Sequence, residues 1–173
     1  MTELAERSYE VHIDLATGFY DRRTMWSRLA EEVARAQRYH YPFSLMLITV
    51  EAGETRRAVE QVLELAKLLK SHTRTADVLV RYSEDILALL LPCTDEQGSV
   101  QLAERIRRMM AQPAQGSELG DPHALRIGLT SMAGDYSGDK VALVEQVEWA
   151  LRKAHKRGGE NRTVVVPAPQ NAS

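Results

Sequence analysis

The sequence has a single cysteine, only two phenylalanines and two tryptophans, and no long hydrophobic run. Cys93 cannot form an internal disulfide, and no pattern of metal ligands accompanies it, so we expect a buried structural thiol. No apolar stretch approaches the roughly 20 residues of a membrane span, and residues 1–10 are of mixed charge. These absences argue against a disulfide scaffold and a membrane protein, and they predict a cytoplasmic one.

The chain also has little net charge. Its formal charge of -2 provides no overall field that would attract nucleic acid or anionic lipid, so we expect neither as a partner. An anionic ligand would therefore need a local cluster of Arg or Lys. With 173 residues, 44% hydrophobic and 27% charged, the sequence is typical of one ordinary globular domain.

Hydrophobic periodicity predicts four helices, over residues 24–39, 56–71, 99–111 and 140–157. It also predicts strands over residues 43–50, 78–82, 86–92, 125–131 and 163–166. The first strand, FSLMLITV, is apolar throughout, which is typical of a strand covered on both faces. Ser83-Glu84-Asp85 separates the second and third strands as the turn of a hairpin.

This order contains the β-α-β-β-α-β core of a ferredoxin-like sheet with additions. We therefore predict an α/β (α+β) fold whose central, mainly antiparallel sheet is flanked by helices. Residues 1–12 form a lead segment, residues 13–166 the domain, and residues 167–173 a disordered tail. Residues 112–122, rich in Gly, Pro and polar residues, form a loop after the third helix.

Four short motifs stand in order along nearly the whole chain. They are DLATGFYDRR (Asp14–Arg23), RTADVLVRY (Arg74–Tyr82), LLLP followed by AERIR (Leu89–Arg107), and VEWALRKA (Val147–Ala154). Together they resemble the D-x-L-T-G-L-x-N-R-R, R-x-x-D, L-L-P, A-E-R-I-R and A-D-x-A-L-Y-x-A-K motifs of the bacterial GGDEF family of diguanylate cyclases. The first motif departs from the family at Ala16, Phe19 and Asp21.

The resemblance implies that Ser83-Glu84-Asp85-Ile86-Leu87 stands where the family has its catalytic turn, G-G-D/E-E-F. Thr49 stands at the position of a metal-binding Asp at the end of the first family strand. A hydroxyl is a poor ligand for Mg²⁺, and Ile86 offers none. Ser83 and Glu84 lose the backbone freedom that paired glycines have. Only Asp85 keeps its carboxylate.

Further departures lie in the regions that hold phosphate and guanine in the family. The segment after residues 43–50 is shorter than in the family, although Glu60 aligns with the guanine-contacting Asp. His155 replaces a Lys of the phosphate pocket, and Glu160 stands near the usual Arg. On these grounds we predict a degenerate pseudoenzyme, with no catalytic residues and no metal or other cofactor.

The R-x-x-D motif is retained as Arg74 and Asp77, which the resemblance assigns to the family's inhibitory site for cyclic di-GMP. Arg105 matches the second arginine of that site, and Arg81 and Arg108 are additional candidates. A guanidinium can donate paired hydrogen bonds to guanine or phosphate, while a carboxylate accepts from guanine N–H groups. The alternative is a solvated surface pair with little energetic value.

Three functions follow as hypotheses. The first is a cyclic di-GMP receptor that signals to a partner protein through Arg74, Asp77 and Arg105. The second is a ligand-independent interaction module derived from a diguanylate cyclase, and the third is a residual cyclase or GTP-binding protein that uses Asp85 and the two glutamates Glu51 and Glu60. A homodimer would be compatible with Trp26 and Trp149, which we place on helix faces suited to core or interface packing.

Overall fold

The computed structural model describes residues 10–50, 55–111, 125–156 and 162–168. The predicted loop over residues 112–122, as well as Glu51 and Glu160, lies outside these ranges. Within them, no helix combines the length and apolar character that crossing a membrane would require.

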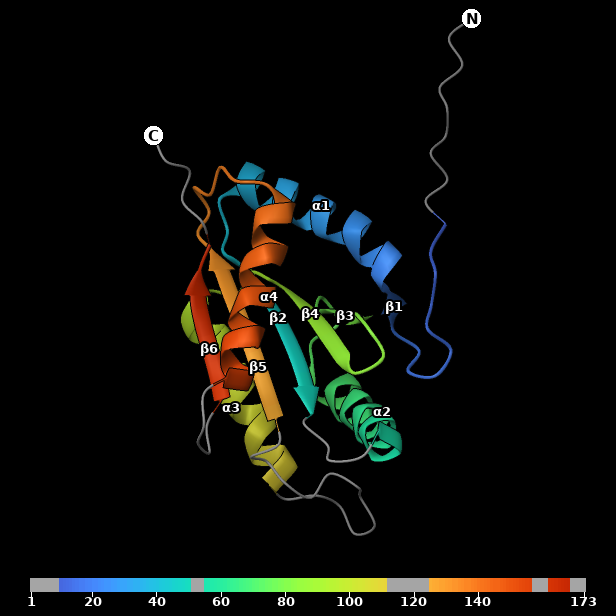
Figure 1. Ribbon diagram of the computed structural model, residues 1–173. Helices are drawn as coiled ribbons and strands as arrows, with labels where there is room; N and C mark the ends of the chain where they lie inside the picture. Colours follow the sequence, from blue (N-terminus) through green and yellow to red (C-terminus); the bar gives the residue numbers. More distant parts are fainter. Residues whose placement is uncertain (1–9, 51–54, 112–124, 157–161, 169–173) are drawn as a thin grey trace, which may run out of the picture.

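A six-stranded sheet with the order β1-β3-β4-β2-β5-β6 forms the centre of the molecule (Figure 1). The strands are β1 (Tyr20–Asp21), β2 (Phe43–Val50), β3 (Val78–Arg81), β4 (Ile86–Pro92), β5 (Leu125–Met132) and β6 (Arg162–Pro167). The helices are α1 (Arg22–Tyr39), α2 (Thr55–His72), α3 (Glu96–Ala111) and α4 (Lys140–Lys156). This architecture confirms the predicted mixed α/β fold.

β2 occupies the middle of the sheet, as its apolar sequence predicts, and all eight of its residues are buried. It is antiparallel to β4 on one side and to β5 on the other. Only the two outer pairs, β1 with β3 and β5 with β6, are parallel. The central sheet is therefore mainly antiparallel, and β2 fixes the register of both neighbours.

The alternation of side chains along the strands divides the core into two layers. One layer joins Met46, Ile48 and Leu89 to residues of α2 and α3. The other joins Leu45 and Leu47 to residues of α1 and α4. Each face of the sheet is thus covered by two helices, as Figure 1 shows.

The observed elements extend or shift the predicted ones by a few residues at their ends. α1 begins two residues before the prediction because the side chain of Asp21 accepts a hydrogen bond from the backbone N–H of Thr24 and caps the helix. It ends at His40, whose φ of 54° is left-handed. Strand β1 was not predicted, since two residues carry no periodic signal.

Two predictions about individual residues are wrong. Cys93 is exposed and has a φ of 51°, because it follows Pro92 in the turn that leaves β4 and does not enter the core. Pro167 belongs to β6, and Ala168 is buried and donates its backbone N–H to Ser131. The ordered chain therefore continues past residue 166, while residues 169–173 of the predicted tail lie outside the described ranges.

Candidate functional site

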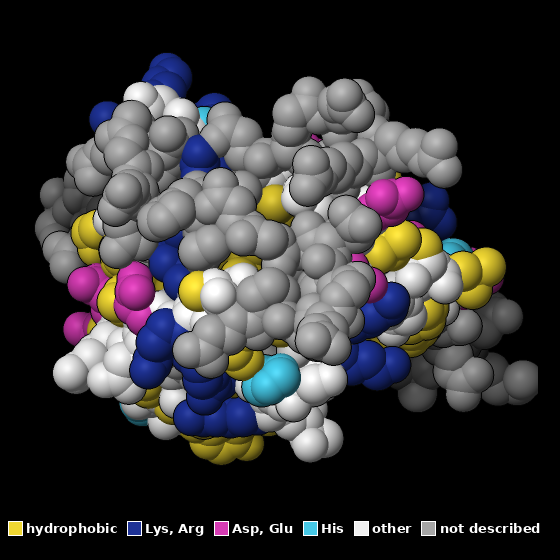
Figure 2. All heavy atoms as spheres, turned by 90° about the horizontal axis from the view of Figure 1, so that it is seen from below, with side chains coloured by type: hydrophobic (Ala, Val, Ile, Leu, Met, Phe, Trp, Pro, Cys, Tyr) yellow, Lys and Arg dark blue, Asp and Glu magenta, His cyan; other side chains and the backbone are white. Residues whose placement is uncertain are grey.

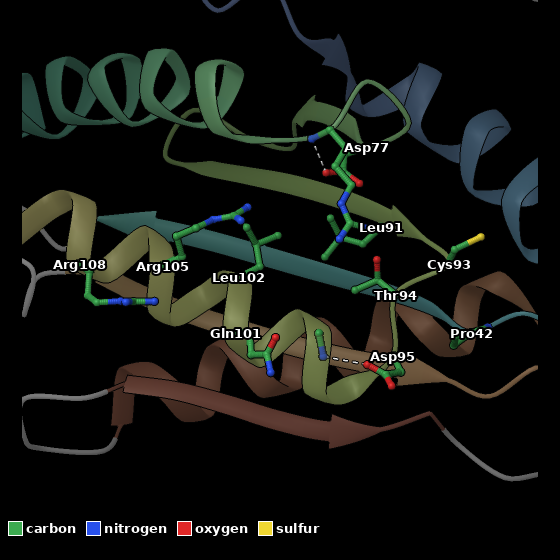
Figure 3. Close-up of a pocket in the computed structure, with 12 residues that line it drawn as sticks. Pro42, Asp77, Leu91, Cys93, Thr94, Asp95, Gln101, Leu102, Arg105 and Arg108 are labelled. Atoms are coloured by element: carbon green, nitrogen blue, oxygen red, sulfur yellow. Dashed lines mark hydrogen bonds between the residues drawn. The ribbon is translucent and has the colours of Figure 1, made fainter.

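The main candidate site is an open pocket of about 470 Å³ between α3, the turn before β3 and the segment after β4 (Figure 3). Three chain segments converge here because β3 and β4 are neighbours and α3 packs on the sheet beside them, against β2 and β5. The pocket is lined by Pro42, Arg74, Asp77, Leu91, Cys93, Thr94, Asp95, Gly98, Gln101, Leu102, Arg105 and Arg108. It therefore combines cations, carboxylates and a small apolar floor.

Arg74 and Asp77 form a tight turn between α2 and β3. The Asp77 carboxylate accepts the backbone N–H of Arg74 at 2.8 Å, and the Asp77 N–H donates to the Arg74 carbonyl at 3.0 Å. The two residues thus fix one another through the backbone, and Arg74 carries its guanidinium on an exposed position. The Asp77 carboxylate thus binds the backbone of Arg74, a contact that the surface pair weighed from the sequence does not include.

Burial raises the pKa of Asp77, while the hydrogen bond from Arg74 and the charges of Arg74 and Arg105 lower it. Burial is the largest effect, so the net pKa lies above 3.8. A carboxylate that is partly removed from water and faces two cations gains from further N–H donors. Asp77 is therefore suited to receive N–H groups from a ligand.

Arg105 and Arg108 reach the pocket from α3, together with Gln101 and Leu102. Positions 101, 105 and 108 recur at the spacing of one helix face. Arg105 donates to the carbonyl of His72 at 3.0 Å, and its side chain extends toward the turn that holds Asp77 in Figure 3. Both arginines are exposed. The structure therefore brings four predicted residues together: Arg74, Asp77, Arg105 and Arg108.

Arg81, the fifth predicted residue, does not line this pocket. It ends β3, and its side chain folds over the following turn, where it donates to the carbonyl of Ser83 at 2.7 Å and to that of Glu84. The strand carries Arg81 away from Arg74 and Asp77, because four extended residues span roughly 13 Å. Arg81 therefore lies outside the pocket that Arg74, Asp77, Arg105 and Arg108 line.

The turn that follows Arg81 carries the positions singled out as degenerate. The backbone N–H groups of Tyr82 and Ser83 both donate to the Ile86 carbonyl, and the Ser83 hydroxyl donates to Asp85 at 2.8 Å. Thr49 is buried in β2 and pairs in register with Ile86. Glu84 and Asp85 are exposed at the turn.

The remaining two predicted positions, Glu60 on α2 and His155 on α4, are exposed. Across the described ranges, no three His, Cys, Asp or Glu side chains converge in a way that could hold a metal ion. Because Glu51 lies outside those ranges, the described residues alone do not define a metal site at the turn.

Tyr82 connects this turn to two helices. Its hydroxyl accepts from Arg22 at 3.0 Å and donates to Glu148, and the Arg22 guanidinium lies 4.4 Å from the centre of the Tyr82 ring. Burial, the hydrogen bond to Glu148 and the charge of that carboxylate raise the pKa of Tyr82 to about 12. The phenol therefore remains protonated and acts as a donor.

Sequence reasoning missed Cys93, Thr94, Asp95 and Gln101 as pocket residues. The first three follow β4 directly, so the predicted pairing of residues 86–92 beside residues 78–82 would have placed them near the start of β3. Gln101 could have been found from its spacing to Arg105. The links from Tyr82 to Arg22 and Glu148 have no sequence signal, since they join residues 60 and 66 positions apart.

The low net charge conceals local groups of like charge. Figure 2 views the molecule from below, and on this face several Lys and Arg side chains gather beside a histidine, with Asp and Glu side chains next to them at the edge. A chain with a formal charge of -2 can thus still present a positive patch to an anionic ligand.

Comparison with known proteins identifies the family. The model of "Diguanylate cyclase, GGDEF domain" matches residues 56–162, more than half of the chain, which therefore belongs to the GGDEF family. Among curated relatives, the diguanylate cyclase DgcP of Pseudomonas aeruginosa is 29% identical over 95% of this chain and 25% of its own length. The diguanylate cyclase DosC of Escherichia coli is 26% identical over 89% and 35%. The chain thus spans about a quarter to a third of these relatives.

Solved structures show the same fold. The diguanylate cyclase SiaD of Pseudomonas aeruginosa, in complex with its activator SiaC, has a TM-score of 0.72 and 25% identity, covering 89% of this chain and 61% of SiaD. The GGDEF domain of DgcB from Caulobacter crescentus, in complex with c-di-GMP, has a TM-score of 0.72 and 18% identity over 88% of this chain and 92% of that one.

These comparisons overturn the prediction that the chain is not an enzyme. The matched family and both curated relatives are named for diguanylate cyclase activity. The departures at Ser83 and Ile86 are single positions within the match over residues 56–162, and Thr49 lies outside that match. Cyclase activity is therefore a candidate function of this chain.

Proposed function

We propose that this GGDEF domain binds cyclic di-GMP in the pocket lined by Arg74, Asp77 and Arg105. The single observation that carries the proposal is the convergence of two exposed guanidinium groups and a half-buried carboxylate around one pocket. The DgcB domain, similar in fold, is a GGDEF domain solved with c-di-GMP, which supports this class of ligand.

The chemistry of the ligand matches these groups. Cyclic di-GMP carries two phosphate charges, and the two arginines offset them while donating N–H groups in a planar fork. The free oxygen of Asp77 accepts from the N–H groups of guanine, whose O6 and N7 accept from an arginine. Leu91 and Leu102 also line the pocket but are buried, so the polar groups would supply most of the contact with the ligand.

Binding in this pocket would be coupled to the turn at Ser83–Asp85. The turn that holds Asp77 leads directly into β3, and β3 leads directly into Tyr82 and the next turn. A ligand that fixes the first end of this short strand restricts the second, since the strand pairs with β1 and β4 on its two sides. We propose that ligand occupancy is passed on to a partner protein in this way, and the protein activator of SiaD supports that kind of partner.

Isothermal titration of the chain with cyclic di-GMP tests the proposal. We expect Arg74→Ala and Arg105→Ala each to weaken binding about tenfold or more, because each removes a charge-assisted donor. Arg38→Ala is the matched control, since Arg38 is an exposed arginine on α1, on the other face of the sheet. Absence of binding to the wild-type chain would leave the ligand-independent interaction module as the better hypothesis.

A second candidate function, favoured by the family match and the names of both relatives, is the synthesis of cyclic di-GMP from GTP. Incubation with GTP and Mg²⁺ or Mn²⁺, followed by chromatography of the products, tests it. Asp85→Asn is the informative variant, because Asp85 carries the carboxylate of the turn. Product formed by the wild type and lost in this variant would assign the activity to the turn.

A further inference from the structure

Strand β6 forms an open edge of the sheet. It is the last strand in the order and, among the described residues, it pairs with β5 alone. Its centre, Val164–Val166, is entirely apolar and carries no charge that would discourage pairing. Alternate N–H and C=O groups of such a strand point away from the sheet and can pair with another strand.

Helix α4 lies directly over this edge, as Figure 1 shows. Its Ala150 and Ala154 pack on Val164 and Val166 of β6. Farther in, a Cβ added to Gly128 of β5 would lie 2.5 Å from the Leu151 backbone nitrogen, so the helix contacts the sheet closely. The helix axis is thus set above β5 and β6, within one or two strand spacings of the open edge.

The outward face of α4 continues the apolar edge. Trp149 remains 43% exposed and lines a groove with Glu145, Gln146, Arg152 and Val166. The ammonium group of Lys153 lies 4.5 Å from the centre of the Trp149 ring. An indole that is partly exposed beside an unpaired strand offers apolar area and an N–H donor to a partner.

The charges on the Trp149 face of α4 are complementary to those of a second copy of this chain. Glu145 lies one helical turn before Trp149 and Lys153 one turn after it, and both are exposed. A two-fold axis beside β6 would set the two α4 helices antiparallel, so that Glu145 of each copy faces Lys153 of the other across the Trp149 side chains. Self-complementarity of this kind is what a symmetric dimer requires.

We propose that the β6 edge and the Trp149 face of α4 form the interface of a symmetric homodimer, with the two β6 strands paired antiparallel. Strands pair about 4.8 Å apart, so helices one to one and a half strand spacings from the axis would lie roughly 10–14 Å apart. Two Trp149 side chains fill a gap of that size. This interface is independent of the cyclic di-GMP pocket, which lies on the α3 face.

Sedimentation equilibrium of the wild-type chain, without nucleotide and with Cys93 kept reduced, tests the proposal. We expect a monomer–dimer equilibrium with a Kd on the order of 1–100 μM. Glu145→Lys and Lys153→Glu should each raise this Kd roughly tenfold, because each places like charges opposite one another. The double variant restores opposite charges, so its Kd should return most of the way to the wild-type value. Trp149→Ala should weaken the dimer at least as strongly.

Tyr39→Ala is the matched control, since Tyr39 is a large exposed aromatic residue on α1 with 64% of its surface accessible. Thermal melting of each variant separates loss of the interface from loss of the fold. A wild-type chain that remains monomeric overturns the proposal. So does a dimer that none of the α4 variants weakens, and so does a double charge reversal that stays as weak as the single ones.

Discussion

The arginines near the two ends of β3 differ in what their guanidinium groups contact. At the amino end, Arg74 is exposed and lines a pocket with Asp77 and with Arg105 of α3, which also donates one hydrogen bond to the His72 carbonyl. At the carboxyl end, the Arg81 guanidinium donates hydrogen bonds to the carbonyls of Ser83 and Glu84. The same chemical group therefore lines an open pocket at one end and stabilises a turn at the other.

The difference follows from what each side chain can reach. A guanidinium has five donors, and it binds the chain's own carbonyls wherever a turn presents them within range. Arg81 meets such a turn directly. Arg74 projects from a turn whose carboxylate and carbonyl are already engaged by the backbone, so its donors face solvent. Counting arginines in a motif thus overestimates the cations that a ligand can use.

The largest expected effect comes from removing both exposed arginines. Arg74→Ala with Arg105→Ala should lower the affinity for cyclic di-GMP by roughly 100-fold or more, because two charge-assisted contacts are lost. Arg81→Ala should leave the affinity within about twofold. Titration calorimetry measures both, and an equal loss in the Arg81 variant would remove the distinction between the two ends of β3.

The next effect concerns the carboxyl end. Tyr82→Phe removes a buried hydroxyl that accepts from Arg22 and donates to Glu148, so it should lower the free energy of unfolding by about 1–3 kcal/mol. Urea denaturation measures this change, with Tyr39→Phe as the exposed control. The affinity for cyclic di-GMP should not change, and a large drop would mean that the pocket depends on Tyr82.

A smaller effect is expected at the turn itself. Arg81→Gln shortens the side chain and removes its hydrogen bonds to the Ser83 and Glu84 carbonyls, which should cost about 1 kcal/mol or less of stability. The backbone N–H groups of residues 83–86 should exchange faster with deuterium, while those of residues 74–77 should not. Uniform acceleration over both segments would contradict a local role.

The smallest effect is a pH dependence of binding. Burial raises the pKa of Asp77, so its proton is taken up at a higher pH than that of an ordinary Asp, and the protonated form accepts fewer N–H groups. The affinity for cyclic di-GMP should therefore be highest near pH 7 and fall a few-fold toward about pH 4. The Asp77→Asn variant should bind cyclic di-GMP weakly, and its affinity should not change with pH over this range. A wild-type affinity that rises on acidification would exclude a carboxylate acceptor.

Much of the fold could be predicted from periodicity alone. The limits of β2 and β4 were predicted without error, because both are continuous apolar runs with turn residues at their ends. The site was harder to predict. The R-x-x-D motif identified Arg74 and Asp77, but the place of Arg108 at the pocket depends on where α3 packs. Arg81 lies outside the pocket because its side chain is turned toward the Ser83 and Glu84 carbonyls.

The sequence by itself determined the helices, the central strands and the family, since these depend on local spacing and on motifs that lie close together in the chain. The tertiary structure decided which arginines line the pocket, that Cys93 lies at the rim of the pocket, and that β6 ends the sheet beside Trp149. Those features depend on strand order and on contacts between distant residues, which the pattern of neighbouring side chains does not encode.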